Sequence, residues 1–153
     1  RIGYMILPPQ LMQRYQERVH RYHQTASKVE QLALARYIQE GQLERQLRRL
    51  RKIYAEKSVR LIEAFQKEFG KEIELVLQET ALYLLVTVKN GMDSQALVDA
   101  ALEQGVKVMP EKQEKDSFGQ VKVGFAGIST QDIPEAVYLL RKAWKRGSPR
   151  NVQ

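Results

Sequence analysis

The sequence predicts an α+β domain, in which a small sheet of about three strands packs with helices and is preceded by long helices. Three observations predict this class. Apolar residues recur at helical spacing through the first 70 residues; a nearly continuous apolar run, "ETALYLLVTV", follows at residues 79–88; and apolar and polar residues alternate in "QVKVGFAGI" at residues 120–128. With 153 residues, 43% of them hydrophobic, the chain has enough apolar material for one ordinary core.

Residues 1–8, "RIGYMILP", read as a short apolar strand that Pro8 and Pro9 stop, because proline cannot donate a hydrogen bond to a neighbouring strand. A strand this apolar needs a sheet, and here it stands alone. The chain also opens without a methionine. We therefore expect the chain to be a fragment of a longer protein.

Residues 9–41 are predicted to form two connecting helices. The apolar face of the first consists of Leu11, Met12, Tyr15, Val19 and Tyr22, and that helix is expected to end near "HQTAS". The second is expected over residues 28–40. Ser27 and Glu30 form a capping-box pattern before it, and Gly41 suits the left-handed position after it.

A third helix is predicted from about Gln42 to Phe69, with Gly70 after it. Its expected apolar stripe consists of Leu43, Leu47, Leu50, Tyr54, Leu61, Ile62, Phe65 and Phe69. The basic residues of its first half are spread around the other faces, whereas a helix that reads phosphates would gather them on one side. We interpret them as a solvated face or a subunit interface, with direct nucleic-acid contact as the alternative.

The strands and helices after residue 70 are predicted from apolar runs and from the residues that begin and end each element. The run at residues 79–88 predicts a central strand, and Asp93 or Ser94 begins a helix that Gly105 ends. "VKVMP" and "QVKVGFAGI" predict two further strands. Ser129 or Thr130 begins a last helix, whose apolar side consists of Ile133, Val137, Leu140 and Trp144. Residues 148–153 are expected to be a flexible tail.

Composition narrows the classes of function. The chain has no cysteine, which excludes disulfides and cysteine nucleophiles and favours a reducing, cytoplasmic location. No apolar run approaches the roughly 18 residues of a membrane-spanning helix, so we expect no membrane contact. His20 and His23 lie three residues apart and could share a metal ion. Without an obvious carboxylate partner we expect surface or interface histidines and no metal.

The segment "SKVEQLALARYIQEGQLERQLRRLRKIYAEK" resembles the start of the small domain of fold-type I proteins that use pyridoxal 5'-phosphate (PLP). It is most similar to the aminotransferase-like half of MocR/GabR-type regulators of the GntR family, in which a winged-helix DNA-binding domain comes first. "RIGYMILPP" resembles the strand after the cofactor lysine, and "VKVGFAGIS" with "EAVYLLRKAW" resembles the last strand and helix of the family. The resemblance implies four segments: an orphan strand of a missing large domain at 1–8, connecting helices at 9–41, an aminotransferase-like small domain at 42–147 and a flexible tail at 148–153.

The resemblance also implies which residues contact ligands. The lysine that holds PLP would lie upstream of Arg1, so we expect PLP in the full-length protein, no cofactor in this fragment, no catalytic residue and no activity of the fragment alone. Arg1 matches the arginine that binds the cofactor phosphate; alternatively it is a chain-end arginine held by nothing. Lys122 falls where related aminotransferases place an arginine for the substrate carboxylate, and it keeps the charge but loses the two-pronged geometry. Its alternative role is the outward residue of a Val-Lys-Val strand.

Three functions compete at this point. The first is the PLP-binding effector and dimerisation domain of a transcriptional regulator, which binds an amine or amino-acid effector and, as a homodimer, acts on DNA through a winged helix in the missing N-terminal part. The second is a PLP-dependent aminotransferase of the aminoadipate or kynurenine type. The third is nucleic-acid binding by the basic helix itself, which would depend steeply on salt.

Overall fold

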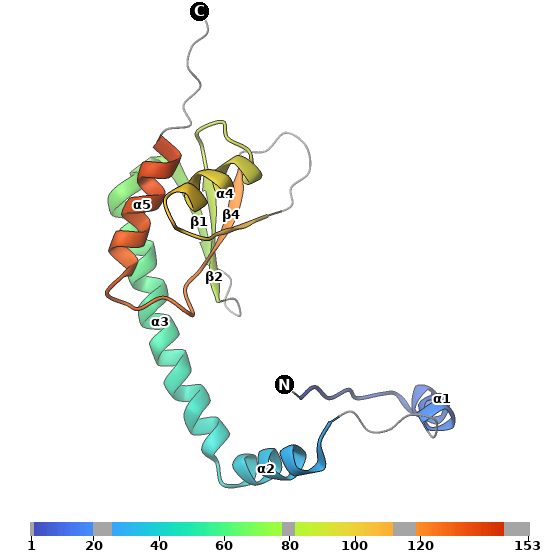
Figure 1. Ribbon diagram of the computed structural model, residues 1–153. Coiled ribbons are helices and arrows are strands. Elements are labelled where there is room, and N and C mark those ends of the chain that lie inside the picture. Colours follow the sequence, from blue (N-terminus) through green and yellow to red (C-terminus); the bar gives the residue numbers. More distant parts are fainter. Residues whose placement is uncertain (1, 20–25, 78–81, 112–118, 146–153) are drawn as a thin grey trace, which may run out of the picture. The chain divides into compact units, whose positions relative to one another are not determined.

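The computed structural model describes residues 2–19, 26–77, 82–111 and 119–145 (Figure 1). The chain divides into two compact units, residues 1–49 and residues 50–153. Among the described residues no helix is long and apolar enough to cross a membrane. The predicted tail at residues 148–153 lies outside the described residues.

The first unit holds α1 (Pro9–Val19), α2 (Lys28–Gln39) and the start of α3 (Gln42–Phe69). The predicted bounds of α3 are confirmed, and α2 ends one residue before its predicted end. Gly41 adopts a φ of 68°, the left-handed conformation expected after α2. The predicted end of the first helix, near "HQTAS", falls partly on residues 20–25, outside the described residues.

The strand predicted at residues 1–8 is not formed, because residues 2–8 have no regular secondary structure. A strand is held by hydrogen bonds to a neighbouring strand, and no described strand pairs with this segment. Its apolar side chains are correspondingly open to solvent, with Tyr4 91% and Ile6 85% exposed. That this segment belongs to a sheet in a longer protein remains a prediction.

Neither α1 nor α2 buries a residue. The apolar stripe predicted for α3 is buried only in the second unit: Leu61, Phe65 and Phe69 are buried, whereas Leu47 is 43% exposed. Periodicity identified the apolar face correctly. The prediction that this stripe is also buried in the first unit was wrong. Burial needs a partner surface, and the described residues leave Leu47 exposed.

The second unit contains a four-stranded antiparallel sheet in the order β1-β2-β4-β3. The strands are β1 (Ile73–Leu77), β2 (Tyr83–Val88), β3 (Met109–Pro110) and β4 (Gln120–Gly124). The predicted α+β class is confirmed, with one strand more than the three expected. β1 was not predicted, because it buries only Ile73 and its five residues show too short a pattern to be separated from the preceding helix.

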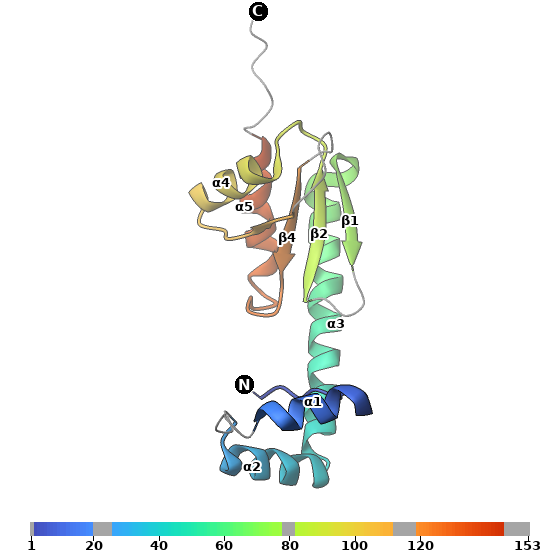
Figure 2. The same ribbon diagram turned by 90° about the vertical axis from the view of Figure 1, so that its right-hand side faces the viewer.

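Helices α4 (Ser94–Glu103) and α5 (Ile133–Lys145) pack with α3 on one face of the sheet. Figures 1 and 2 both show α5 alongside the C-terminal half of α3. There the ring centroid of Trp144 lies 6.3 Å from that of Phe65 and 5.6 Å from that of Phe69. The predicted apolar side of the last helix is confirmed, since Ile133, Val137, Leu140 and Trp144 are all buried.

One predicted capping bond and one predicted helix start differ from the structure; α2 itself begins at Lys28 as predicted. Ser27 makes no side-chain capping bond; instead the side-chain amide of Gln31 donates to the carbonyl oxygen of Ala26 at 3.0 Å. The last helix begins at Ile133 rather than next to Ser129, because the Ser129 hydroxyl accepts from the Gln131 N–H at 3.2 Å and closes a turn.

The predicted cap of α4 is confirmed, because the Asp93 carboxylate accepts from the Ala96 N–H at 2.8 Å. Replacing Asp93 with alanine should therefore lower the free energy of unfolding by about 0.5–2 kcal/mol, whereas asparagine, which caps equally well, should leave it nearly unchanged. Urea unfolding followed by Trp144 fluorescence measures both variants. Equal losses in both would show that the hydrogen bond does not stabilise α4.

Candidate functional site

The candidate site is the face of the sheet opposite the core, which we call the open face. Side chains alternate along a strand, so the burial of Leu84, Val86, Val121 and Val123 places their neighbours on this face. The strand register then gives the rows Glu74–Thr87–Gln120, Val76–Leu85–Lys122–Met109 and Tyr83–Gly124. One hydrogen bond on this face joins the Gln120 amide to the Thr87 hydroxyl at 2.8 Å.

Lys122 is held on the open face by Glu111. The backbone N–H of Glu111 donates to the Gln120 carbonyl oxygen at 3.0 Å, which continues the pairing of β3 with β4 by one residue. Glu111 therefore lies on the same face as Lys122 and diagonal to it. The Lys122 Nζ forms an ion pair with Glu111 Oε2 and lies 5.3 Å from the centroid of the Tyr83 ring. Each side chain of the pair is only 28% exposed.

The ion pair fixes the charge of Lys122. The side-chain hydrogen bond to Glu111 raises the pKa of Lys122 above its ordinary value, against the opposing effect of burial, and the charges of Glu111 and Tyr83 add to the rise. Lys122 is therefore a cation at neutral pH, and its charge is already compensated. The alternative role predicted for Lys122, an outward residue of a Val-Lys-Val strand, did not include this partner.

The other predicted site residues cannot be placed beside Lys122. Arg1, predicted to bind the cofactor phosphate, lies outside the described residues, and so do His20 and His23. Among the residues that the structure does describe, no three histidine, aspartate or glutamate side chains gather as a metal site would require.

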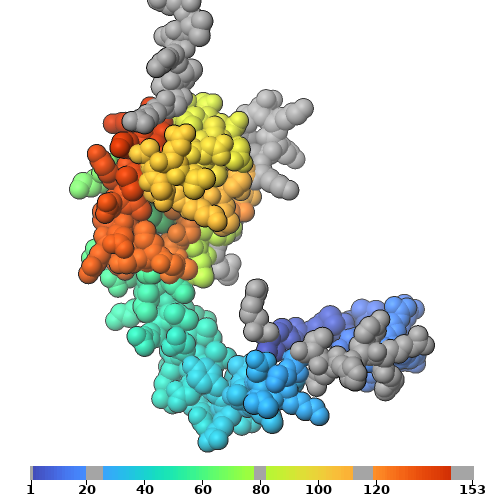
Figure 3. Space-filling model, viewed as in Figure 1, coloured from blue at the N-terminus to red at the C-terminus, as the bar shows by residue number. Residues whose placement is uncertain are grey.

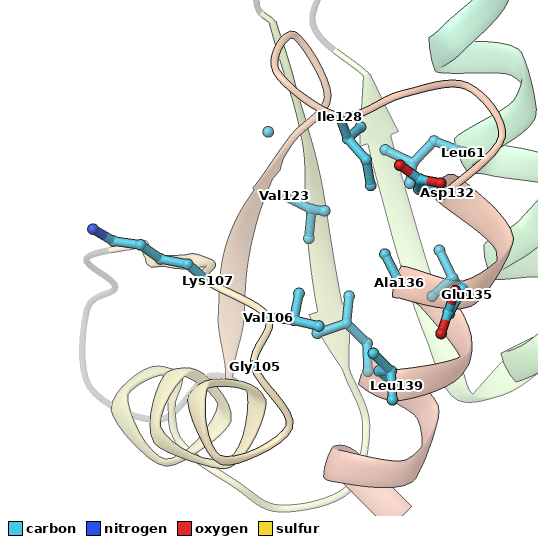
Figure 4. Close-up of a pocket in the computed structure, with 13 residues that line it drawn as sticks. Leu61, Gly105, Val106, Lys107, Val123, Ile128, Asp132, Glu135, Ala136 and Leu139 are labelled. Carbon is cyan, nitrogen blue, oxygen red and sulfur yellow. The ribbon is translucent and has the colours of Figure 1, made fainter.

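A pocket of about 370 Å³ lies on the other side of the sheet, between β4, residues 105–107 and α5. Figure 3 shows the side chains of α4 and α5 adjoining one another on this part of the surface. Val106 and Val123 face the hollow, Asp132 and Glu135 line it from the side of α5, and Lys107 points away from it (Figure 4). Two carboxylates without an arginine would repel a phosphate group. This pocket therefore does not fit PLP.

The arginines in the first half of α3 are exposed to solvent, and some of them have partners on the same surface. Arg45, Arg48, Arg49 and Arg51 are all exposed. Arg48 lies 3.7 Å from the Glu44 carboxylate, and Arg45 donates to the Glu40 carbonyl oxygen at 3.2 Å. Partners on the same surface reduce the charge that a phosphate backbone would meet, which favours the solvated interpretation of this helix.

Comparison with known proteins agrees with this architecture. The family model described as aminotransferase class I and II matches residues 1–140. The chain belongs to this family. The fold agrees too: the structure of LysN, an α-aminoadipate aminotransferase from Thermus thermophilus, matches 92% of the chain and 37% of its own length with a TM-score of 0.76 and 23% identity. Kynurenine aminotransferase from Pyrococcus horikoshii matches 75% of the chain and 29% of its own length, with a TM-score of 0.66 and 22% identity. The second unit thus has the fold of an aminotransferase small domain.

Curated relatives are more similar in sequence. YdeL of Bacillus subtilis, described as an uncharacterised HTH-type transcriptional regulator, is 35% identical over 95% of the chain and 32% of its own length. YhdI of the same organism, with the same description, is 33% identical over 94% of the chain and 31% of its own length. The chain thus spans about a third of the length of the curated relatives it matches.

Proposed function

We propose that the chain is the C-terminal part of the effector and dimerisation domain of a PLP-binding transcriptional regulator, in which it senses an amine or amino acid. The observation that carries the proposal is the 35% and 33% identity to two HTH-type regulators over nearly the whole chain. A third relative, the probable rhizopine catabolism regulatory protein MocR of Rhizobium meliloti, is 27% identical over 94% of the chain. In this proposal the regulator is a cytoplasmic homodimer that contacts DNA through an N-terminal winged helix.

The exposed apolar surface of the first unit supports a larger assembly. Its exposed apolar side chains in α1 and α2 are Leu11, Met12, Tyr15, Val19, Val29, Leu32, Leu34, Tyr37 and Ile38. Monomeric proteins rarely leave so much apolar surface open on neighbouring elements, and such patches mark sites of association. We assign this surface to contacts within the longer protein and its homodimer.

In the proposed full-length protein each candidate residue has one task. PLP supplies an aldehyde that reacts with amines, and the lysine that holds it lies upstream. Arg1 pairs with the cofactor phosphate through its two-pronged guanidinium. Lys122 and Glu111 line the side of the effector site that the small domain contributes.

A PLP-dependent aminotransferase of the aminoadipate or kynurenine type is the second candidate. The observation that favours it is the 22% identity to the 2-aminoadipate transaminase of Thermus thermophilus over 95% of the chain and 37% of that protein. Both candidates share this small domain, so the fold does not distinguish them. The regulator should bind DNA sequence-selectively, whereas the aminotransferase should turn over an amino-acid substrate.

The decisive experiment compares the full-length protein with the 153-residue chain. The full-length protein should bind its own promoter region selectively by fluorescence anisotropy, and an amine should change that binding. Turnover of 2-aminoadipate or kynurenine by the full-length protein, without selective DNA binding, would establish the aminotransferase instead. The 153-residue chain should bind duplex DNA weakly and without sequence preference, because no element that reads bases accompanies the exposed arginines in the part of the chain that the structure describes. Selective binding by this chain near physiological salt would make the basic helix itself the DNA-binding module.

A further inference from the structure

We propose that the effector sensed at the open face is an amine that carries no carboxylate, and that Glu111 is the residue that excludes the carboxylate. This inference rests on the proposed function, because it narrows the class of ligand for the same site. Its evidence is the placement of charges on the open face.

The two lysines that β4 and the end of β2 place on this face are each paired with a carboxylate. Lys122 is paired with Glu111, and Lys89, two positions beyond Thr87 on the same face, is paired with Glu74 at 2.5 Å. Two cations thus meet two carboxylates, and each cation already has its own partner. A ligand carboxylate that approaches Lys122 or Lys89 would therefore meet a cation whose charge is already compensated.

Taking Lys122 from Glu111 would be costly. The Glu111 side chain is 28% exposed, and a hydrogen bond to Gln120 fixes the Glu111 backbone to β4. The backbone therefore cannot move away from β4 to expose the carboxylate to solvent. A displaced Glu111 would remain partly buried without a counter-charge, which is unfavourable. A ligand that left the pair intact would place a second carboxylate beside Glu111, where the two negative charges repel.

The identity of the cation adds to this exclusion. An arginine presents five N–H donors in a planar fork and can hold two carboxylates side by side, whereas lysine is a compact point charge. Lys122 is also directed over the ring of Tyr83. Lys122 therefore has the charge to bind a second carboxylate but lacks the geometry to hold two carboxylates side by side.

An amine fits the same surroundings. A carboxylate offers about four acceptor positions on two oxygens, and Lys122 engages Oε2 of Glu111, so Oε1 can accept from an ammonium group. Tyr83 and Leu85 are half-buried and Met109 is 53% exposed, which provides apolar surface for a carbon stem. The site therefore combines an acceptor for an ammonium group with an apolar wall.

The charge exclusion is tested first on the 153-residue chain, with acetate as the carboxylate probe. Sodium acetate replaces sodium chloride at a constant ionic strength of about 0.1 M, and NMR follows the ε-methylene signals of Lys122 and of the exposed Lys142. In the wild type we expect Lys122 to respond no more than Lys142. In Glu111→Gln we expect a saturable shift at Lys122, because its charge is no longer compensated.

A matched control removes the other carboxylate of the same face. Glu74→Gln breaks the pair with Lys89 and should leave Lys122 unresponsive to acetate. A saturable shift at Lys122 in the wild type, its absence in Glu111→Gln, or its appearance in Glu74→Gln would each overturn the role of Glu111. None of these outcomes depends on whether the full-length protein regulates transcription.

The ligand class is tested on the full-length protein with pairs that differ only in one carboxylate: agmatine with L-arginine, and 1,5-diaminopentane with L-lysine. Calorimetry should show the amine of a pair binding at least about tenfold more tightly than the amino acid, and Glu111→Gln should reduce that ratio at least about tenfold. Equal or tighter binding of the amino acids by the wild type, or no preferential amine binding in either pair, would overturn the amine assignment. Failure of the proposed function is separate, since it appears as absence of selective DNA binding.

Discussion

Replacing Trp144 with alanine is expected to lower the free energy of unfolding of the second unit by about 3–5 kcal/mol. Trp144 is 2% exposed, and its ring lies within 6.3 Å, centroid to centroid, of both Phe65 and Phe69. Its indole Nε1–H donates to the Leu97 carbonyl oxygen at 3.0 Å, which ties α5 to α4. The substitution therefore removes a large buried ring together with the hydrogen bond that ties α5 to α4.

Urea unfolding followed by circular dichroism measures this loss, because Trp144 is the only tryptophan and the variant has no comparable fluorescence signal. The matched control is Tyr138→Ala on the same helix, since Tyr138 is 58% exposed and its loss should cost little. Trp144→Phe should fall between them, because it keeps a ring and loses the hydrogen bond. A loss in Trp144→Ala no larger than in Tyr138→Ala would mean that the aromatic cluster does not hold the helices together.

The helices of this chain could be predicted from sequence because their signals are local. Glycine at positions 41, 70 and 105 marks three helix ends, and each adopts the positive φ that favours glycine there. The Asp93 cap is equally local, since it lies three residues from the N–H it accepts. Apolar periodicity then identified the face of α5 that packs in the core.

The features that could not be predicted depend on partners distant in sequence. β1 is recognisable as a strand only through its pairing with β2, in which Ile73 opposes Val88. Ser27 has the right sequence context for a cap, yet the side chain of Gln31 takes a different bond. In the first unit the helices formed as predicted, but the apolar side chains of α1 are exposed, because no sequence pattern states what covers them.

The candidate site shows the same division. Lys122 was found from its place in a Val-Lys-Val strand and from the family resemblance. Glu111 was missed because it opens the polar segment "EKQEKDSFG", which reads as a loop, and only the register of β3 with β4 brings it beside Lys122. The partner changes the chemistry of the site, since a compensated lysine is a poor receptor for a carboxylate.

Gly119 ends that same polar segment and is the most constrained glycine of the described part of the chain. A Cβ added there would lie 2.3 Å from the Met92 carbonyl oxygen and 2.8 Å from Leu97 Cδ1. The backbone is tied on both sides as well, because the Gly119 N–H donates to Met92 at 3.1 Å and its carbonyl oxygen accepts from Val88 at 3.0 Å. A shift that relieves the contact must therefore strain these hydrogen bonds.

Gly119→Ala is consequently expected to lower the free energy of unfolding by about 1–3 kcal/mol, the usual cost of forcing extra atoms into a packed interior. The control is Gly127→Ala, where an added Cβ meets nothing within 4 Å and the backbone has no positive φ. That variant should be neutral or slightly stabilised, because alanine restricts the unfolded chain. Both are measured by urea unfolding with Trp144 fluorescence. If alanine at 119 proved as harmless as alanine at 127, the close approach of β4 to the start of α4 would not exist in solution. The segment that carries Glu111 would then join β4 in a different way, and the charge balance inferred for the open face would lose its structural basis.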